Sequence, residues 1–236
     1  MTQKSDPFDE AFLDFMAGKH DASLIIRTNK GEDEIMPVRY FFRSLEEMPE
    51  IEKTAMHHCY GKILDIGAGT GCHSLVLQAM GFDVTAVDIR PSFVEIMRKR
   101  GVHKAYVSDI LDFNSGSYDT LLLLMNGIGF TGNLRGLRKF LVHARKLLAK
   151  GGQILLDSCD LMYLHEEQEG VFRIDLHEGY HGEIVYEIEY NGLKGVPFQW
   201  LFIDYLTLEE IASEEGYELE LLSEGEQFSY LARLRF

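Results

Sequence analysis

The feature that most constrains the fold is a short apolar run that leads into a glycine-rich turn and then into a helix-like segment, within residues 62–74. The run Lys62–Ile66 has the composition of a buried strand, and Gly67, Gly69 and Gly71 follow it at alternate positions. Glycine permits a tight turn and lets a ligand approach the backbone without a β-carbon in the way. The spacing is GxGxG, whereas the dinucleotide fingerprint GxGxxG would place its third glycine at Cys72. The run therefore predicts a strand–turn–helix unit that binds a ligand.

Apolar runs alternate with amphipathic segments through residues 62–158, a pattern typical of a parallel sheet with helices on both faces. The expected strands are Lys62–Ile66, Val84–Asp88, Lys104–Ser108, Tyr118–Met125 and Gln153–Ser158. The expected helices are Cys72–Met80, Pro91–Arg100 and Leu134–Lys150, the last ended by Gly151-Gly152. A chain of 236 residues can bury one substantial core, so we predict an α/β fold with a doubly wound, mostly parallel sheet.

Beyond residue 160 the apolar spacing changes to the alternation of antiparallel strands. Alternating apolar positions predict a three-stranded meander over 172–176, 184–190 and 198–202, with a tight turn at Asn191-Gly192. A helix with Thr207 as its N-cap and Gly216 at its end follows. Two final strands are expected at Tyr217–Ser223 and Phe228–Phe236.

Residues 1–60 are less regular. We expect them to form an N-terminal cap, with helices over Asp9–Met16 and Ser44–Cys59 and a small hairpin around Lys30-Gly31. Residues 61–236 are expected to form the ligand-binding domain, and residues of about 161–199 to be an antiparallel β insertion in it.

Acidic or amide side chains stand at the ends of four predicted parallel strands: Asp65, Asp88, Asp109 and Asn126. The carboxyl ends of such strands share one edge of the sheet, which is where ligands bind. Asp88 is spaced to accept hydrogen bonds from both hydroxyls of a ribose, and Asp109 with Ile110 to hold an adenine. Asp65 precedes the turn, where a carboxylate can accept hydrogen bonds from the amino end of a cationic ligand.

These motifs closely resemble the class I S-adenosylmethionine-dependent methyltransferases. The family's first motif matches Leu64–Gly71, its ribose-binding acid matches Asp88, its adenine-binding acid matches Asp109, and its motif after the fourth strand matches Tyr118–Gly127. Leu208–Phe236 resembles the family's reversed seventh strand. The resemblance implies a Rossmann-like fold with a seven-stranded, mostly parallel sheet, with S-adenosylmethionine as the cofactor and S-adenosylhomocysteine as its product.

The cofactor-binding residues that the resemblance implies all lie at the ends of the first four parallel strands. They are Asp65, Gly67, Ala68, Gly69, Gly71, Asp88, Ile89, Asp109, Ile110 and Asn126. Family members that methylate exocyclic amines of bases or glutamine amides carry Asn/Asp-Pro-Pro-Tyr after the fourth strand. Here Asn126 is followed by Gly-Ile-Gly, which disfavours those substrates.

The charge of the chain points to a small acceptor. With 23 basic and 38 acidic residues, the formal net charge of -15 repels phosphate backbones and anionic membrane surfaces. No apolar signal core stands at the start, and no apolar run approaches the ~18 residues of a membrane span. We therefore expect a cytoplasmic protein that acts on a small molecule, without nucleic acid or a membrane as partner. No feature indicates an oligomeric state.

No residue stands out as a catalytic base, because the cofactor supplies the activation and the protein chiefly aligns donor and acceptor. Candidates for the acceptor pocket are Tyr40, Tyr163 and His165, each of which could instead pack or lie in a solvated loop. A metal site is not expected, because the side chains of adjacent residues such as His57 and His58 point apart on a helix. His181 lies in a predicted turn and is expected to be exposed.

Two other functions remain open at this point. A nicotinamide-dependent oxidoreductase could use a similar glycine turn, although Cys72 and the reversed terminal hairpin weigh against it. A non-catalytic sensor or regulatory protein that binds S-adenosylmethionine would carry the same cofactor motifs, since the transfer requires no dedicated catalytic residue.

Overall fold

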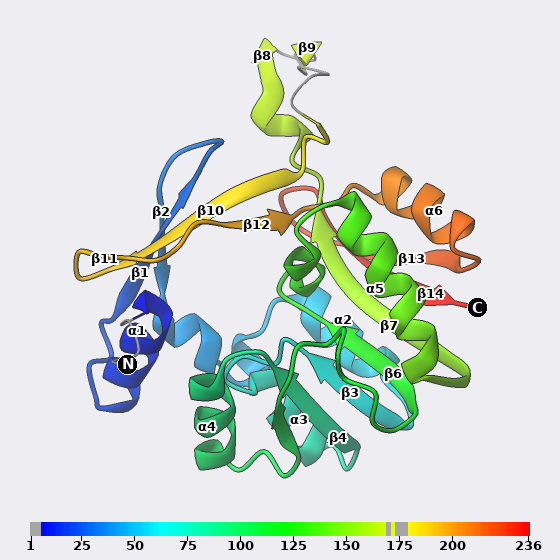
Figure 1. The fold of residues 1–236 in the computed structure, drawn as a ribbon, viewed down its shortest axis with the longest axis horizontal. Helices are drawn as coiled ribbons and strands as arrows, with labels where there is room; N and C mark the ends of the chain where they lie inside the picture. Colours follow the sequence, from blue (N-terminus) through cyan, green and yellow to red (C-terminus); the bar gives the residue numbers. More distant parts are fainter. Residues whose placement is uncertain (1–5, 169–170, 173–178) are drawn as a thin grey trace.

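The computed structural model describes residues 6–168, 171–172 and 179–236. Its largest element is a seven-stranded sheet with strand order β13-β14-β7-β6-β3-β4-β5 (Figure 1). The strands are β3 (Lys62–Ile66), β4 (Asp83–Asp88), β5 (Ala105–Val107), β6 (Tyr118–Leu123), β7 (Leu148–Cys159), β13 (Glu218–Glu224) and β14 (Ser229–Arg235). The five strands from β7 to β5 are parallel, whereas β14 is antiparallel to both β7 and β13. This confirms the predicted α/β class and the mostly parallel seven-stranded sheet.

Helices cover both faces of this sheet because its central strands are apolar on both sides. Leu121 and Leu123 of β6 belong to the core cluster under α5 (Leu134–Leu147) and α6 (Tyr205–Glu214). Leu122, on the opposite face, packs with residues of α2 (Glu50–His58) and α3 (Cys72–Ala79). The helix α4 (Pro91–Arg100) contributes Val94 and Met97 to a further cluster beside α3.

A second, antiparallel sheet combines the N-terminal segment with the segment after residue 180. Its strands are β1 (Ser23–Thr28), β2 (Glu34–Pro37), β10 (Glu183–Tyr190), β11 (Leu193–Lys194) and β12 (Phe198–Leu201). The strands β1 and β10 pair with Ile26 opposite Ile188, and β12 pairs with the other edge of β10. The helix α1 (Pro7–Met16) packs on this sheet, with Phe12 in the shared core (Figure 1). Residues far apart in the chain therefore build one structure beside the main sheet.

The structure contains only part of the predicted three-stranded meander. The hairpin at Asn191-Gly192 is confirmed, since Tyr190 and Leu193 are paired. The first of its three strands falls mostly on residues 173–178, outside the described residues. Within the described residues, Val171–Phe172 forms the short strand β9, which pairs with β8 (Glu166–Gln168). The edge of β10 that the meander would have used is occupied by β1.

Three predicted helix boundaries are wrong. The helix expected to reach Lys150 ends at Leu147, and the two glycines expected to stop it lie within β7. The cap of α6 is Asp204 and not Thr207, because the Asp204 side chain accepts a hydrogen bond from the Thr207 N–H and starts the helix earlier. The long helix expected over 44–59 is split by Pro49 into the 3₁₀ turn η2 (Leu45–Glu47) and α2.

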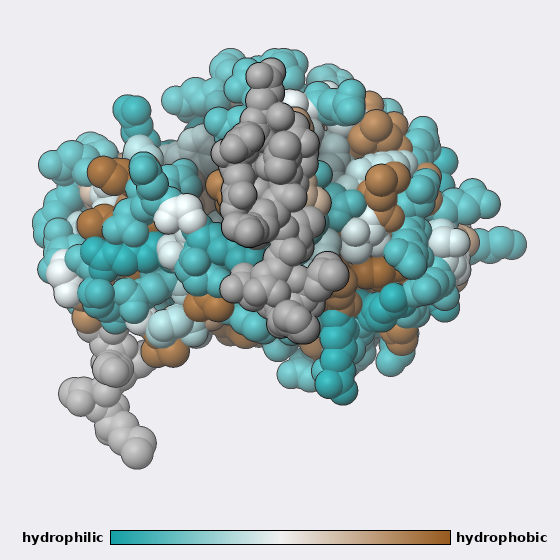
Figure 2. Space-filling model, turned by 90° about the horizontal axis from the view of Figure 1, so that it is seen from above, coloured by the Kyte–Doolittle hydropathy of each residue, from teal (hydrophilic) through white to brown (hydrophobic). Residues whose placement is uncertain are grey.

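Seen from above, the surface is mainly polar, with apolar residues scattered singly or in small groups (Figure 2). Such scattering is ordinary for a protein surface and marks no broad apolar contact area on the visible face. Among the helices of the described residues, none combines the length and the apolar character that crossing a membrane requires.

Candidate active site

The glycine turn joins β3 to α3, and its three glycines have different surroundings. Gly67, Gly69 and Gly71 have φ angles of 69°, 54° and 81°, which L side chains rarely adopt. A β-carbon added to Gly67 or Gly69 would meet no heavy atom within 4 Å. At Gly71 it would lie 2.8 Å from Cγ2 of Val102 and 3.0 Å from Cγ of Met97. The first two glycines therefore border free space, whereas the third is required by packing.

The backbone amides of this turn are hydrogen-bonded within the protein. Gly67 and Ala68 both donate to the carbonyl oxygen of Val87, at 2.9 and 3.1 Å. Gly71 donates to the carbonyl oxygen of Ala68 at 2.8 Å. These amides are therefore already paired. The turn offers a ligand mainly the open space above Gly67 and Gly69.

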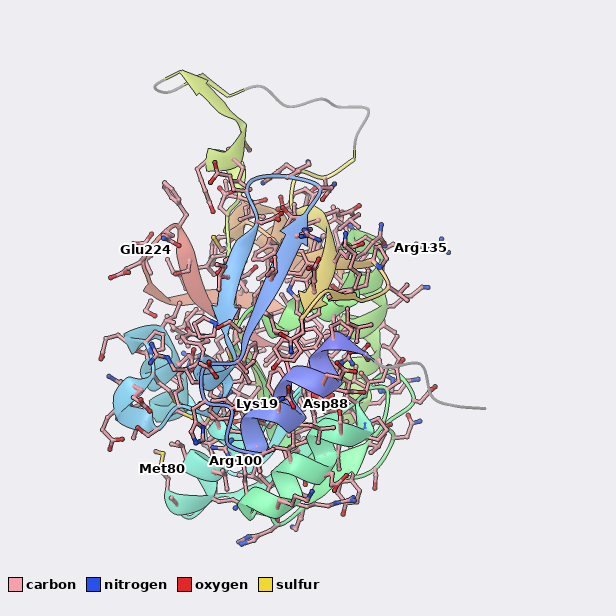
Figure 3. All side chains as sticks on the ribbon, turned by 90° about the vertical axis from the view of Figure 1, so that its left-hand side faces the viewer. Lys19, Met80, Asp88, Arg100, Arg135 and Glu224 are labelled. Atoms are coloured by element: carbon pink, nitrogen blue, oxygen red, sulfur yellow. The ribbon has the colours of Figure 1, made fainter. Side chains whose placement is uncertain are left out.

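Asp88 ends β4 beside this open space. Its side chain is buried, and its two carboxylate oxygens accept hydrogen bonds from the N–H groups of Gly69, at 2.9 Å, and Arg90, at 2.8 Å. Burial raises the pKa of the carboxyl, although the two N–H donors oppose this shift. The next residue, Ile89, is 65% exposed, which is unusual for isoleucine at the end of a buried strand. In Figure 3, Asp88 lies near α1, where the N-terminal elements meet the main sheet.

The structure separates the two residues that were predicted to hold an adenine after β5. Asp109 is exposed, and its Oδ1 accepts a hydrogen bond from the N–H of Leu111 at 2.9 Å. Ile110 is buried in the core cluster with Val87 and Phe113. The carboxylate is therefore accessible to a ligand, whereas the isoleucine supports the loop from beneath.

Asp65 lies beneath the glycine turn, where it is almost completely buried. Its Oδ2 accepts a hydrogen bond from the Ser74 hydroxyl at 2.6 Å. Burial raises its pKa, while His73 and Ser74 act in the opposite direction. The carboxylate thus connects the end of β3 to the first turn of α3.

A strained turn follows β6. Met125 and Asn126 both have left-handed backbone conformations, with φ angles of 61° and 51°, which cost energy in residues other than glycine. The Asn126 N–H donates to Oδ1 of Asp157 at 3.0 Å, and its side-chain amide donates to the carbonyl oxygen of Leu201 at 3.1 Å. Its side-chain oxygen accepts a hydrogen bond from the Ser158 hydroxyl at 2.9 Å. Because β7 and the end of β12 hold it so closely, the turn is rigid.

The sequence reasoning missed a buried chain of charged residues beside this turn. The Arg43 guanidinium donates to Oε1 of Glu52, and Oε2 of Glu52 lies 2.7 Å from Nε2 of His73. All three side chains are at least 95% buried. Burial opposes a charge on His73, but the Cys72 sulfur and the Glu52 carboxylate raise its pKa well above the usual value. No local pattern marks these residues, because they come from three separate elements.

Asp157, in β7, was also missed as a site residue. It is partly exposed, and burial together with the nearby charge of Glu52 raises its pKa to about 7. One signal was present in the sequence, since Asp157 directly follows the apolar run Ile154–Leu156 of a predicted buried strand.

The three predicted acceptor-pocket residues have different surroundings. The Tyr40 ring lies 4.0 Å from Cζ of Arg43, within the 3₁₀ turn η1 (Val38–Phe42). The Tyr163 ring is stacked on Phe228, with ring centroids 5.8 Å apart. The backbone of His165 ends the 3₁₀ turn η4 (Met162–His165), and its side chain lies outside the described residues.

The structure corrects one expectation about the histidines. His181 is not exposed as predicted but buried, with Nε2 3.2 Å from Oδ1 of Asp160. The turn that carries it is tied to the chain after β12, because the Phe202 N–H donates to the carbonyl oxygen of Gly182 and the Tyr180 hydroxyl donates to Asp204. In the described part of the chain, no group of three or more His, Cys, Asp or Glu residues is arranged to hold a metal ion.

Comparison with known proteins agrees with this architecture. A family model described as a methyltransferase domain matches residues 63–152. The demethylmenaquinone methyltransferase of Tropheryma whipplei is 28% identical over 100 residues, which is 40% of this chain and 40% of that protein. The chain thus matches less than half the length of this curated relative.

Solved structures resemble the whole chain. An S-adenosylmethionine-dependent methyltransferase from Bacteroides fragilis, crystallised with S-adenosylhomocysteine, is 38% identical, with a TM-score of 0.91 over 100% of this chain and 96% of that one. DesVI of Streptomyces venezuelae has a TM-score of 0.60 over 98% of this chain and 99% of that one, and at 14% identity it shows the shared fold alone.

The geometry of the sheet edge fits an adenosyl cofactor. The free space above Gly67 and Gly69 would admit a ligand, whereas a side chain at either position would obstruct it. The carboxylate of Asp88 borders that space. Together with the extent of the likeness to the Bacteroides fragilis enzyme, these features show that the chain belongs to the S-adenosylmethionine-dependent methyltransferases and uses S-adenosylmethionine as its cofactor.

Proposed function

We propose that this enzyme methylates a small molecule that binds between the carboxyl edge of the main sheet and the elements that cover it. The main support for this proposal is that the N-terminal segment covers this edge of the sheet. The Thr70 hydroxyl in the glycine turn donates a hydrogen bond to the carbonyl oxygen of Phe41 in η1. Arg100 of α4 donates to the carbonyl oxygen of Thr70 at 2.8 Å, and its guanidinium lies 4.9 Å from the ring centroid of Phe42. The N-terminal segment is thereby fastened over the edge where the cofactor binds.

A macromolecular acceptor would need that edge to be open. The second sheet strengthens the cover, because β1 from the N-terminal segment is paired with β10 along Ile25–Thr28. The formal net charge of -15 adds a long-range repulsion for nucleic acid. Both features favour an acceptor small enough to enter beneath the cover.

In the proposed site, Asp88 accepts hydrogen bonds from the ribose hydroxyls, and Ile89 and Asp109 flank the adenine. The carboxylate oxygens of Asp88 retain lone pairs beyond those used by Gly69 and Arg90, so two further hydroxyl donors can be accommodated. Ile110 acts from beneath, since it is buried. The amino-acid end of the cofactor would lie near Asp65, on the β3 side of the turn.

The remaining predicted residues shape the space between these groups. Gly67, Ala68, Gly69 and Gly71 would hold the turn in its open form, and Asn126 would form the wall on the β6 side. Bound S-adenosylmethionine supplies a methyl carbon attached to a positively charged sulfur, so the chain's own contribution is to bind, orient and exclude water. Tyr40, Tyr163 and His165 are proposed to border the acceptor on the side of the cover.

Transfer of a labelled methyl group from the cofactor tests the proposal. The enzyme is incubated with the small-molecule, protein and nucleic-acid fractions of one cell extract, and incorporation is counted in each fraction. The proposal expects label in the small-molecule fraction, with background levels in the other two. Preferred labelling of protein or nucleic acid, by kcat/KM, would overturn it.

A further inference from the structure

Asp157 lies on the side of the site that faces away from the nucleoside end of the cofactor. The sheet order is β7-β6-β3-β4-β5, and the groups proposed to hold ribose and adenine follow β4 and β5. S-adenosylmethionine held by these groups would extend across the glycine turn after β3, which would bring its sulfur end toward β6. The next strand is β7, which carries Asp157. An acceptor that approaches the methyl carbon from beyond the sulfur therefore arrives beside this carboxylate.

The Asp157 side chain is held in one position. Its Oδ1 accepts the hydrogen bond from the N–H of Asn126 in the strained turn. The Ser158 hydroxyl donates to the Asn126 side chain, and the N–H of Ile203 donates to Ser158 Oγ at 3.0 Å. A carboxylate fixed in this way pays little further entropy when it binds a ligand.

Asp157 also lacks a cation among the described residues. The two neighbouring cations, Arg43 and His73, are both engaged with Glu52. Three acids, Glu52, Asp65 and Asp157, lie beside these two cations. Because burial raises the pKa values of Asp65 and Asp157, a further positive charge next to Asp157 would stabilise its ionised form. Asp157 is the partly exposed member of this group, whereas the other four side chains are buried.

The Arg43 side chain connects the buried charges to the same strained turn. Nε of Arg43 is a buried donor without a partner among the described residues, and Nη1 of the same side chain lies 3.5 Å from Sδ of Met125 in the strained turn. Unpaired buried donors are rare in folded proteins. Arg43 and Asp157 therefore contact the same turn, Arg43 at Met125 and Asp157 at Asn126.

We propose that Asp157 is the catalytic residue that receives the methyl acceptor, and that the acceptor is an amine that binds to its carboxylate as an ammonium ion. This inference rests on the proposed function, since it assigns the class of the small molecule and the residue that binds it. It also gives the Asp157 carboxylate a role that the cofactor-binding residues leave open.

The transfer balances with Asp157 as proton acceptor. The bound ammonium gives one proton to the Asp157 carboxylate, which frees the nitrogen lone pair. That lone pair forms the new C–N bond to the methyl carbon while the C–S bond breaks, and its electron pair stays on sulfur as the thioether. The product leaves as an N-methylammonium ion, and the carboxylic acid of Asp157 releases its proton to water.

The basicity of Asp157 suits an amine better than an alcohol. A carboxyl whose pKa is raised to about 7 is close enough to an alkylammonium ion, at about 10, to take its proton in a pre-equilibrium. An alcohol is far less acidic and carries no charge for the carboxylate to recognise. The raised pKa, which is caused mainly by burial, thus suits both proposed roles of Asp157, which are to bind the ammonium ion and to accept its proton.

Calorimetry with two cofactor analogues tests the proposal without knowledge of the acceptor. S-adenosylhomocysteine lacks the methyl group, whereas sinefungin carries an amino group on a carbon in place of the methylated sulfur. The ammonium group of sinefungin therefore lies where the acceptor and methyl group meet. In Asp157→Asn we expect the Kd for sinefungin to rise by about tenfold or more, because one charge-assisted contact is lost. The Kd for S-adenosylhomocysteine should change by less than about twofold, because that ligand makes no such contact.

The matched control is Asp160→Asn, three residues further along the chain. Asp160 is also partly exposed, but its carboxylate is paired with His181. The control should leave the ratio of the two Kd values unchanged. If Asp160→Asn and Asp157→Asn lower sinefungin binding equally, or if Asp157→Asn weakens both ligands alike, the assignment of Asp157 to the acceptor is wrong.

The pH dependence of the unmodified enzyme gives a test that needs no variant. The titratable groups around Asp157 are Glu52, His73, Tyr40, Cys159 and Tyr230. As pH rises through about 7, Asp157 ionises and sinefungin should gain affinity relative to S-adenosylhomocysteine. A flat ratio between pH 6 and pH 8 would contradict the proposal, whereas failure of S-adenosylhomocysteine itself to bind would instead contradict the proposed function.

Discussion

The Asp88 carboxylate accepts the N–H of Gly69 across the glycine turn, at 2.9 Å, so the acid that ends β4 fixes the conformation of the turn that ends β3. These two strands are neighbours in the sheet, paired in parallel along Lys62–Ile66. Asp88 therefore shapes the open space above the turn. We propose that it also binds the ligand that occupies this space.

Replacing Asp88 by alanine should weaken S-adenosylhomocysteine binding by about tenfold to a hundredfold, because hydrogen bonds from the ribose hydroxyls to a charged acceptor are lost. Isothermal titration calorimetry measures the effect. The control is Asp83→Ala at the opposite end of the same strand, where the exposed carboxylate pairs with Lys104. Equal affinity of the Asp88 variant and the unmodified enzyme would show that the ribose lies elsewhere.

Substitutions at two glycines of the turn should have different main effects, Gly71→Ala on stability and Gly67→Ala on ligand binding. Gly71→Ala combines an unfavourable positive φ with a β-carbon only 2.8 Å from Val102, and should lower the free energy of unfolding by about 2–4 kcal/mol. Gly67→Ala adds a β-carbon in open space, so its cost should be limited to about 1–2 kcal/mol of backbone strain. Its affinity for S-adenosylhomocysteine should nevertheless fall at least about tenfold, because the β-carbon occupies the space proposed for the ligand. Urea unfolding and calorimetry together check both outcomes, and a Gly67 variant with intact affinity would contradict the proposed site.

The buried chain Arg43–Glu52–His73 should be essential for stability. Glu52→Gln leaves two buried cations without their shared anion, and should cost about 3–5 kcal/mol at neutral pH. Because the pKa of His73 is raised in the folded protein, its stabilising effect is fully present below the pKa of the unfolded chain and is lost as pH rises through the folded value. The unmodified protein should therefore lose stability at alkaline pH, and Glu52→Gln should flatten that dependence. A parallel pH dependence in both proteins would contradict this account.

Asp157→Asn should stabilise the protein in the absence of ligands. A carboxyl whose pKa is higher in the folded state than in the unfolded chain weakens the fold once it ionises. This loss in the free energy of unfolding is absent below about pH 3.8, and it reaches its full size above about pH 7. Asparagine keeps an oxygen that can accept the Asn126 N–H, so the variant should gain at least about 1 kcal/mol more at pH 8 than at pH 5. Urea unfolding at the two pH values measures this, and a loss of stability at pH 8 would mean that the carboxylate is paired in the fold.

Local patterns were enough to predict the centre of the fold. Leu121–Met125 is apolar at both alternating sets of positions, which is typical of a strand buried on both faces, and the glycine turn marks where the first strand of the sheet ends. The end of β4 at Asp88 was predicted for the same reason. These features depend on neighbours within a few residues.

Pairings between distant residues could not be predicted in this way. The pairing of Ile26 with Ile188 joins segments 162 residues apart, and either strand could have paired with a local neighbour. Likewise, Arg43, Glu52 and His73 meet only after η1, α2 and α3 have packed. The cap of α6 was misplaced because Thr207 matches a capping pattern, whereas in the structure the Thr207 N–H donates to the side chain of Asp204, three residues earlier, which is the actual cap.

A crystal structure with bound S-adenosylhomocysteine tests the central claim most directly, because it shows which way the ligand lies along the sheet edge. We predict that the ribose hydroxyls are within hydrogen-bonding distance of Asp88 and that the sulfur lies toward the Asn126 turn, with Asp157 beyond it. A nucleoside over β6 and β7, or a ligand bound away from the glycine turn, would contradict the account.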